Sequence, residues 1–206
     1  KDLGAADVTY AKGAFSGNGK SVSLLDLAKQ LAPAGGAHPL DTDAEGSFGA
    51  TYPNSCHIAE VEIDPDTGEA NVVRYTSVND FGTLVNPLIV AGQVQGGVVQ
   101  GIGQCFLEQT VYTQDGQLAT GSFMDYGMPR AQHLSMIDAL FNEVPCKTND
   151  LGVKGAGEAG ACGAPGAFVS AVCDALKDLG IRHIDMPLTP DRVWQTIQKA
   201  KAAKAA

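Results

Sequence analysis

The sequence lacks the marks of several common classes of protein. Its five cysteines are scattered without a Cys-x-x-Cys pair, so the chain encodes neither a zinc site nor an iron–sulfur cluster of its own. Basic residues are fewer than acidic ones, 14 against 23, and the net charge of −9 argues against a nucleic-acid partner, whose phosphates would repel the chain. The sequence contains no apolar run that could span a bilayer and no signal-peptide pattern. We therefore expect a soluble, cytoplasmic protein that binds neither nucleic acid nor membrane.

Glycine, by contrast, is abundant, and the densest glycine run surrounds a single carboxylate. The run extends from Gly152 to Gly166 and contains Glu158 among small residues, which allow a ligand to approach the main chain closely. Apolar residues then recur at helical spacing from Ala164 to Leu179, which predicts a helix with Pro165 in its first turn and Gly180 as its stop. We therefore predict that Glu158 is a catalytic residue on a loop before a helix.

The same run also matches the pattern G-x-G-x-x-G through Gly155, Gly157 and Gly160. Asp178 lies near the spacing of the acid that binds ribose in a dinucleotide fold. That fold requires a hydrophobic strand directly before the first glycine, whereas Lys147–Lys154 is largely polar. A nucleotide-binding oxidoreductase domain is therefore an alternative and not the preferred interpretation.

A second glycine-rich stretch, from Leu88 to Gln109, has the spacing of a helix. Gln93, Gln100 and Gln104 fall on one stripe, and the apolar residues from Val94 to Phe106 fall on a different face. Each glycine inside a helix costs about 1 kcal/mol relative to alanine, so the glycines of this stretch require a reason. Two explanations remain for the glycines, namely close packing of a second helix and close approach of a ligand. For Gln93, whose amide can donate and accept, we favour contact with a ligand.

The whole pattern predicts an α+β fold, with mixed strands and hairpins and a few helices. A hairpin is expected from His57 to Val78, with Gly68 in its turn. Glu60 and Glu62 share one face of its first strand, which we interpret as solvated, and His57 is expected to be structural. The other expected elements are a serine-capped helix at Ser23–Leu31, a strand–turn–strand at Thr110–Thr120, strands at Ile137–Val144 and Ile181–Pro187, and a helix that begins at Pro190.

Three segments, in this order along the chain, resemble the molybdenum hydroxylases, the family of xanthine dehydrogenase, aldehyde oxidase and aerobic carbon monoxide dehydrogenase. The last one, Leu151–Ala167, resembles the final cofactor-contacting segment of that family. Asn86–Gln104 agrees with an earlier motif, and Tyr52–Asp64 extends the resemblance toward the N-terminus. The chain is thus similar to the C-terminal part of the molybdenum-cofactor-binding large subunit.

The resemblance implies an oxidoreductase that hydroxylates an electrophilic carbon with oxygen from water. Glu158 would be the catalytic base, and Gln93, Gly155, Ala156 and Gly157 would contact the cofactor. That cofactor is a molybdenum-pyranopterin, as molybdopterin or as its cytosine dinucleotide form, and no residue of this chain is expected to ligate the metal. A 2Fe-2S cluster and FAD are expected on other domains or subunits.

The resemblance also divides the chain and implies partners. Residues 1–50 would be an irregular lead-in with a short helix, and residues 51–206 the C-terminal portion of the molybdenum-cofactor-binding domain. The sequence begins at Lys1 without a methionine, which suggests a piece of something longer. Expected partners are the remaining molybdenum-binding region or subunit, iron–sulfur and flavin subunits, and a small-molecule substrate. A non-catalytic scaffold or fragment is the other alternative, against which the carboxylate of Glu158 argues.

Overall fold

The computed structural model describes residues 7–43, 45–47, 49–133 and 136–205. The chain divides into two compact units, Lys1–Ser47 and Phe48–Ala206, which we describe separately. None of the described helices is long and apolar enough to cross a membrane. All of the candidate site residues belong to the second unit.

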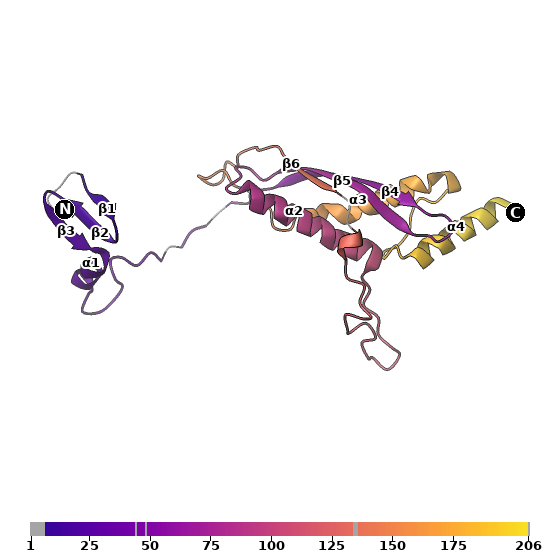
Figure 1. Cartoon of the computed structure of the whole chain (residues 1–206), viewed down its shortest axis with the longest axis horizontal. Helices are drawn as coiled ribbons and strands as arrows, with labels where there is room; N and C mark the ends of the chain where they lie inside the picture. Colours follow the sequence, from indigo (N-terminus) through magenta and orange to yellow (C-terminus); the bar gives the residue numbers. More distant parts are fainter. Residues whose placement is uncertain (1–6, 44, 48, 134–135, 206) are drawn as a thin grey trace. The chain divides into compact units, whose positions relative to one another are not determined.

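The first unit contains a small antiparallel sheet and one helix (Figure 1). Strands β1 (Thr9–Ala11), β2 (Ala14–Gly17) and β3 (Lys20–Ser23) pair in sequence order, and α1 (Leu24–Leu31) follows directly. Ser23 caps α1, since its Oγ accepts a hydrogen bond from the Asp26 backbone N–H at 3.0 Å, which confirms the serine-capped helix. The prediction of an irregular lead-in missed the strands, because they are three or four residues long and glycine-containing turns separate them.

A three-stranded sheet forms one layer of the second unit. Strands β4 (Asn54–Ile63) and β5 (Ala70–Asp80) form an antiparallel hairpin, and β6 (Ile137–Phe141) joins β5 in parallel, in the order β4-β5-β6. The register of β4 with β5 confirms the predicted hairpin. Tyr75, Ser77 and Asn79 alternate along β5 and are all buried, so this face of the sheet is the inner one.

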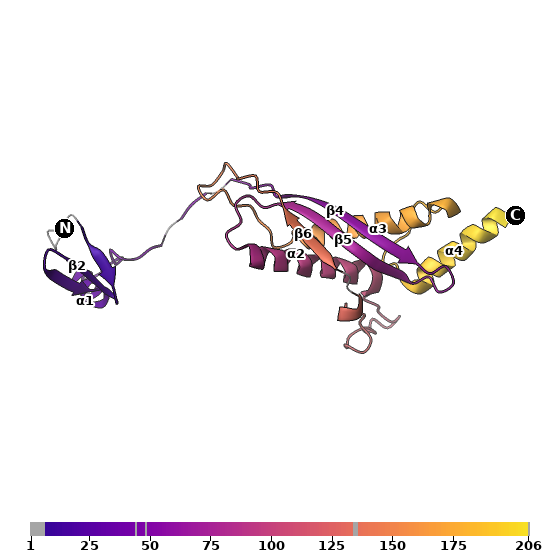
Figure 2. The same cartoon turned by 45° about the horizontal axis from the view of Figure 1, so that its top comes forward.

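Helices cover the inner face of the sheet (Figure 2). Helix α2 (Pro87–Ile102) continues as a π-helical turn, η1 (Gly103–Leu107), which confirms the helix predicted between Leu88 and Gln109. Helix α3 (Ala159–Ala175) packs against α2 and β4, and α4 (Pro190–Ala205) begins at the predicted proline. Single 3-10 turns, η2 (Ala131–His133) and η3 (Lys177–Leu179), complete the described helical elements. The confirmed α+β fold therefore consists of a hairpin-based sheet over a pair of helices.

Helices α2 and α3 touch through glycine. A Cβ atom added at Gly97 of α2 would lie only 2.8 Å from the backbone nitrogen of Ala161. One added at Gly160 of α3 would lie 2.8 Å from the backbone nitrogen of Val98. Since real Cβ atoms essentially never lie within 3.0 Å of such atoms, the two helix backbones can approach this closely only where both residues are glycine.

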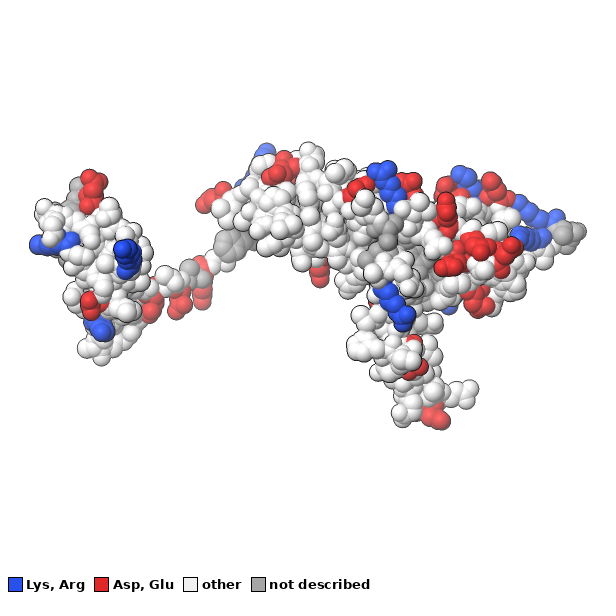
Figure 3. All heavy atoms as spheres, viewed as in Figure 1, with Lys and Arg blue, Asp and Glu red and all other residues white. Residues whose placement is uncertain are grey.

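The glycines of α2 divide into two groups. Gly97 and Gly101 are buried at the contact with α3, where a side chain at Gly101 would overlap Ala164. Gly92 and Gly96 are exposed, and a Cβ at either would meet no atom within 4 Å. The helix contains no charged residue, and the surface around it is largely uncharged in Figure 3. Packing of α3 therefore explains the first pair of glycines, and the second pair leaves an open, uncharged surface.

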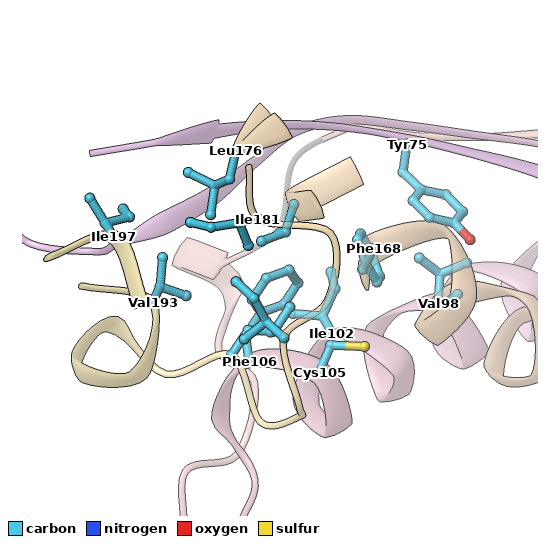
Figure 4. Packing of buried hydrophobic residues seen from close by; sticks show 14 of the residues in the cluster. Tyr75, Val98, Ile102, Cys105, Phe106, Phe168, Leu176, Ile181, Val193 and Ile197 are labelled. Carbon is cyan, nitrogen blue, oxygen red and sulfur yellow. The ribbon is translucent and has the colours of Figure 1, made fainter. Parts of the chain in front are cut away.

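The core of the second unit lies between the sheet, α2, α3 and the C-terminal segment (Figure 4). The ring of Tyr75 on β5 is 5.0 Å from that of Phe168 on α3, which is 5.4 Å from that of Phe106. Val193 and Ile197 of α4 are fully buried and close the opposite end of the cluster. The core thus fixes α3 between β5 and η1.

Helix α3 begins at Ala159, well before the predicted start near Pro165. Pro165 lies inside the helix, where it removes one backbone hydrogen bond. Ala164 and Phe168, on either side of the proline, are completely buried, so packing holds the helix together at this point. The prediction was wrong because it used the local signal of proline, which the tertiary contacts outweigh.

Two predicted strand regions are irregular in the structure. Ile181 and Ile184 are only 7% and 5% exposed, yet no described strand pairs with the segment from Ile181 to Pro187, so its apolar residues enter the core as coil. Between Thr110 and Thr120 the structure contains one isolated bridge, from Tyr112 to Leu118. The first prediction was wrong because a short apolar pattern indicates burial without indicating a pairing partner. In the second segment the predicted antiparallel pairing is present, since the N–H of Ala119 donates to the Val111 carbonyl at 2.8 Å, but it is too short to form strands.

Candidate functional site

A pocket with a volume of about 540 Å³ opens beside the Glu158 loop. Its walls come from the start of β4 and from the segment that enters α3. Most of the lining residues are small, and Glu158 is the one acidic residue among the described residues that line it. The lining residues are Pro53, Ser55, His57, Gly155, Ala156, Gly157, Glu158, Ala159, Cys162 and Gly163.

Glu158 occupies the N-cap position of α3 but does not cap the helix with its side chain. Its φ and ψ angles are −113° and 0°, its side chain accepts no capping hydrogen bond, and the residue is exposed. A cap residue normally commits its side-chain oxygen to the first turn of the helix. The carboxylate of Glu158 therefore lines the pocket without a hydrogen bond to the helix.

Backbone hydrogen bonds hold the segment that leads to Glu158. The Gly152 carbonyl accepts hydrogen bonds from the N–H groups of Thr83 and Cys146, both at 2.9 Å, and the Lys154 N–H donates to the Phe81 carbonyl at 2.8 Å. Gly82 has a φ of +64° and lies so close to Gly152 that a side chain would overlap the Gly152 carbonyl. The segment is therefore attached to the residues that follow β5.

An ion pair strengthens this attachment. Lys154 Nζ lies 2.5 Å from Asp80 Oδ2, and the two side chains are only 9% and 13% exposed. The hydrogen bond from Lys154 is the main reason why the pKa of Asp80 is lowered. Sequence reasoning missed this pair, because the two residues are 74 positions apart in the chain and nothing local to either one indicates its partner.

The structure brings Gln93 next to the glycines of the Glu158 loop. A Cβ added at Gly157 would lie 3.7 Å from Gln93 Nε2, and one added at Gly155 would meet no atom within 4 Å. Gln93 is exposed on α2, and its amide forms no hydrogen bond with another described residue. Gln93, Gly155, Ala156 and Gly157 therefore lie around one open surface at the edge of the pocket.

His57 forms part of the pocket wall. Its Nδ1 is 2.7 Å from the hydroxyl of the fully buried Tyr75, and its ring packs on Gly163, where a side chain would overlap the imidazole. Its Nε2 is buried and has no hydrogen-bond partner among the described residues. Burial lowers the pKa of His57 and raises that of Tyr75, so both groups are neutral at pH 7. The predicted structural role of His57 thus accounts for one ring nitrogen only.

The nucleotide-binding interpretation finds no support in this geometry. It requires a strand directly before Gly155, but the described backbone there forms only the isolated bridge between Gly82 and Val153. Asp178 lies in η3, directly after α3, and not at the end of a second strand. Within the described ranges, no group of three or more His, Cys, Asp or Glu side chains is arranged to hold a metal ion.

Comparison with known families assigns the chain to one of them. Residues 1–135 match the family model described as the molybdopterin cofactor-binding domain. The chain belongs to this family. This match confirms the resemblance to the molybdenum hydroxylases at the level of the cofactor-binding domain. The match ends before Glu158, so the longer alignments below are the ones that include the loop of the predicted base.

Individual relatives of this molybdopterin-binding chain are parts of oxidoreductases. It is 41% identical to the nicotine 6-hydroxylase large subunit of Paenarthrobacter nicotinovorans, over 84% of this chain and 22% of that one. It is 34% identical to subunit gamma of the 6-hydroxypseudooxynicotine dehydrogenase complex of the same organism, over 96% of this chain and 26% of that subunit. Among solved structures, quinoline 2-oxidoreductase from Pseudomonas putida 86 superposes with a TM-score of 0.70 at 33% identity, over 94% of this chain and 26% of that one. The chain therefore spans about a quarter of the length of these relatives.

Proposed function

We propose that this chain completes the active site of a molybdenum hydroxylase, with Glu158 as the catalytic base. The observation that carries the proposal is the state of this carboxylate. It is exposed, it does not cap α3, and it is the one acid among the described residues that line the pocket beside it. Membership of the molybdopterin-binding family supports a redox cofactor at this place.

The residues around the pocket fit a cofactor of this kind. Gln93 presents an uncommitted amide beside Gly157, and no side chain occupies the space over Gly155. An amide that can donate and accept matches the edge of a pterin ring, and glycine permits close contact with the main chain. We infer that Gln93, Gly155, Ala156 and Gly157 would hold a molybdenum-pyranopterin, as molybdopterin or its cytosine dinucleotide form. When bound, that cofactor would supply the capacity to take electrons from the substrate carbon.

The role of Glu158 is to accept a proton at a carboxylate oxygen, so that oxygen from water can be transferred to an electrophilic carbon. A carboxylate is a weak base in water and becomes a stronger one when it is desolvated. Glu158 is exposed in this chain, so the cover that excludes water would come from outside it. The proposed function therefore includes a partner surface over the pocket.

We propose that this partner surface is the remaining molybdenum-binding region, on the same or another chain. Iron–sulfur and flavin subunits would then drain the electrons to an acceptor. The relatives support this arrangement by name, since one is a large subunit and another is subunit gamma of a complex. The names of the relatives differ in substrate, so the proposal concerns the class of reaction.

The test replaces Glu158 with Gln in the complete enzyme that contains this chain. The amide keeps the shape of the side chain and removes the base, so turnover should fall by a factor of about 10² to 10⁴ while the molybdenum and pterin contents are unchanged. Glu62→Gln is the matched control, because Glu62 is an exposed acid on β4 outside the pocket, and it should have no effect. Normal turnover by the Glu158→Gln enzyme would refute the proposed role.

A further inference from the structure

The segment between Lys154 and Glu158 contains only one side chain, that of Ala156, which is partly buried against the core. Gly155 and Gly157 are exposed, and a Cβ added at Gly155 would meet no atom within 4 Å. A segment with few packed side chains has few contacts to restrict its motion. The position of the Glu158 carboxylate therefore depends on how firmly the two ends of this segment are held.

The downstream end is held by helix packing. Gly160 packs against α2 so closely that a side chain would overlap the backbone of Val98. Glu158 is only two residues before Gly160. The start of α3 is thus fixed against the buried core. The upstream end lacks such a helix and is held by backbone hydrogen bonds to Phe81 and Thr83, to which the side chain of Lys154 adds a further contact.

The side chain of Lys154 is the last long one before Gly155, and it adds an ion pair to these backbone hydrogen bonds. Its ammonium lies 2.5 Å from Asp80 Oδ2, and both side chains are largely buried. Removal of one partner from a buried pair leaves the other charge without compensation, which makes such a pair costly to break. The contact differs in this respect from the pair of Lys177 with Asp174, whose side chains are 60% and 72% exposed.

Asp80 connects three segments through its two oxygens. Oδ1 accepts hydrogen bonds from the backbone N–H groups of Gly82 at 3.0 Å and Val144 at 3.1 Å, while Oδ2 accepts from Lys154. Gly82 follows β5, Val144 follows β6, and Lys154 begins the loop of Glu158. One carboxylate at the end of the sheet therefore ties the loop to the ends of β5 and β6.

We propose that Lys154 and Asp80 are positioning residues for Glu158. Their ion pair fixes the entry of the glycine segment on the end of the sheet, and α3 fixes its exit, so that the carboxylate is held at the pocket. Neither residue lines the pocket, so both act through the loop and not on the substrate. This inference rests on the proposed function, because Glu158 needs to be positioned only if it takes part in the reaction.

The test uses the complete enzyme with Lys154→Met, which keeps the length of the side chain and removes its charge. Lys154→Arg is the rescue variant, since a guanidinium can donate to the same carboxylate. Lys177→Met is the matched control, because it removes an exposed lysine from an exposed pair. Each enzyme is measured for kcat, KM, molybdenum content and backbone hydrogen exchange in the peptide that spans residues 153–160.

We expect Lys154→Met to lower kcat by about 10²-fold, the effect of a displacement of about 1 Å at a reacting group. KM and molybdenum content should be unchanged, exchange in the 153–160 peptide should be faster, and Lys154→Arg should restore most of kcat and of the protection. The proposal is overturned if kcat is unchanged in Lys154→Met, if molybdenum is lost with it, or if Lys177→Met has the same effect. It is also overturned if Lys154→Arg is as impaired as Lys154→Met.

The outcome separates this proposal from the function on which it rests. An inactive Glu158→Gln enzyme together with a fully active Lys154→Met enzyme removes the positioning role and leaves the base in place. A fully active Glu158→Gln enzyme removes the base, whatever the exchange experiment shows for Lys154. Hydrogen exchange measures how firmly the Lys154–Asp80 ion pair holds the loop, and it does not depend on turnover. Failure of the positioning role can therefore be distinguished from failure of the proposed base.

Discussion

The contact between α2 and α3 predicts opposite effects for two neighbouring glycines. Gly96 and Gly97 are consecutive residues of α2, but only Gly97 faces α3. Replacement of either by alanine should favour the helix by about 1 kcal/mol, since alanine loses less backbone freedom than glycine on folding. The comparison of Gly97→Ala with Gly96→Ala therefore cancels helix propensity and isolates the packing effect.

The magnitude of that effect follows from the distances. A Cβ at Gly97 would lie 2.8 Å from Ala161 N and 3.0 Å from Gly160 Cα, both backbone atoms that no rotamer change can move. An ordinary contact would require a shift of about 0.6 Å between the helices, and overpacking of this kind costs about 1–3 kcal/mol. For a chain of this size each kcal/mol corresponds to about 2–4 °C in Tm, so Gly97→Ala should unfold about 2–12 °C below Gly96→Ala.

Thermal unfolding of the two variants, followed by circular dichroism at one pH and protein concentration, measures this difference. Gly166→Ala in α3 provides a second control, because a Cβ there would meet no atom within 4 Å. The same Tm for Gly96→Ala and Gly97→Ala would refute the close approach of the two helices, and with it the geometry that places the Glu158 loop beside Gln93.

Two further predictions concern pH and thiol reactivity. Burial lowers the pKa of His57 from 6.5, so the unfolded chain binds a proton more readily than the folded one and stability should fall as the pH drops below about 6.5. His57→Gln should show a smaller loss between pH 7.5 and pH 5.5 in urea-unfolding midpoints, and an unchanged loss would contradict the burial of this ring. Burial raises the pKa of Cys105 to about 12, whereas Cys162 is exposed. A thiol reagent at pH 8 should therefore label Cys162 in the folded chain and Cys105 only after unfolding, and rapid labelling of Cys105 would contradict the packing of the core.

Local patterns were sufficient to predict the elements whose signals are long and regular. The helix at Leu88–Gln109, the hairpin that begins at His57 and the helix at Pro190 follow from periodicity and from cap and turn residues, and the structure confirms them. The prediction failed where non-local contacts decide. Pro165 lies inside α3, and Ile181 and Ile184 enter the core without a strand partner, because burial outweighs the local preference.

The sequence by itself determined the chemistry available at the site. It supplied one carboxylate in a glycine run and an amide on a glycine-rich helix, and these residue types in this order were enough to indicate the family. Only the tertiary structure decided that the two segments meet. Their meeting depends on two glycine backbones in contact, Gly97 and Gly160, and on an ion pair between Asp80 and Lys154, residues 74 positions apart. Contacts between residues so distant in the chain are selected by packing and burial, which no local pattern encodes.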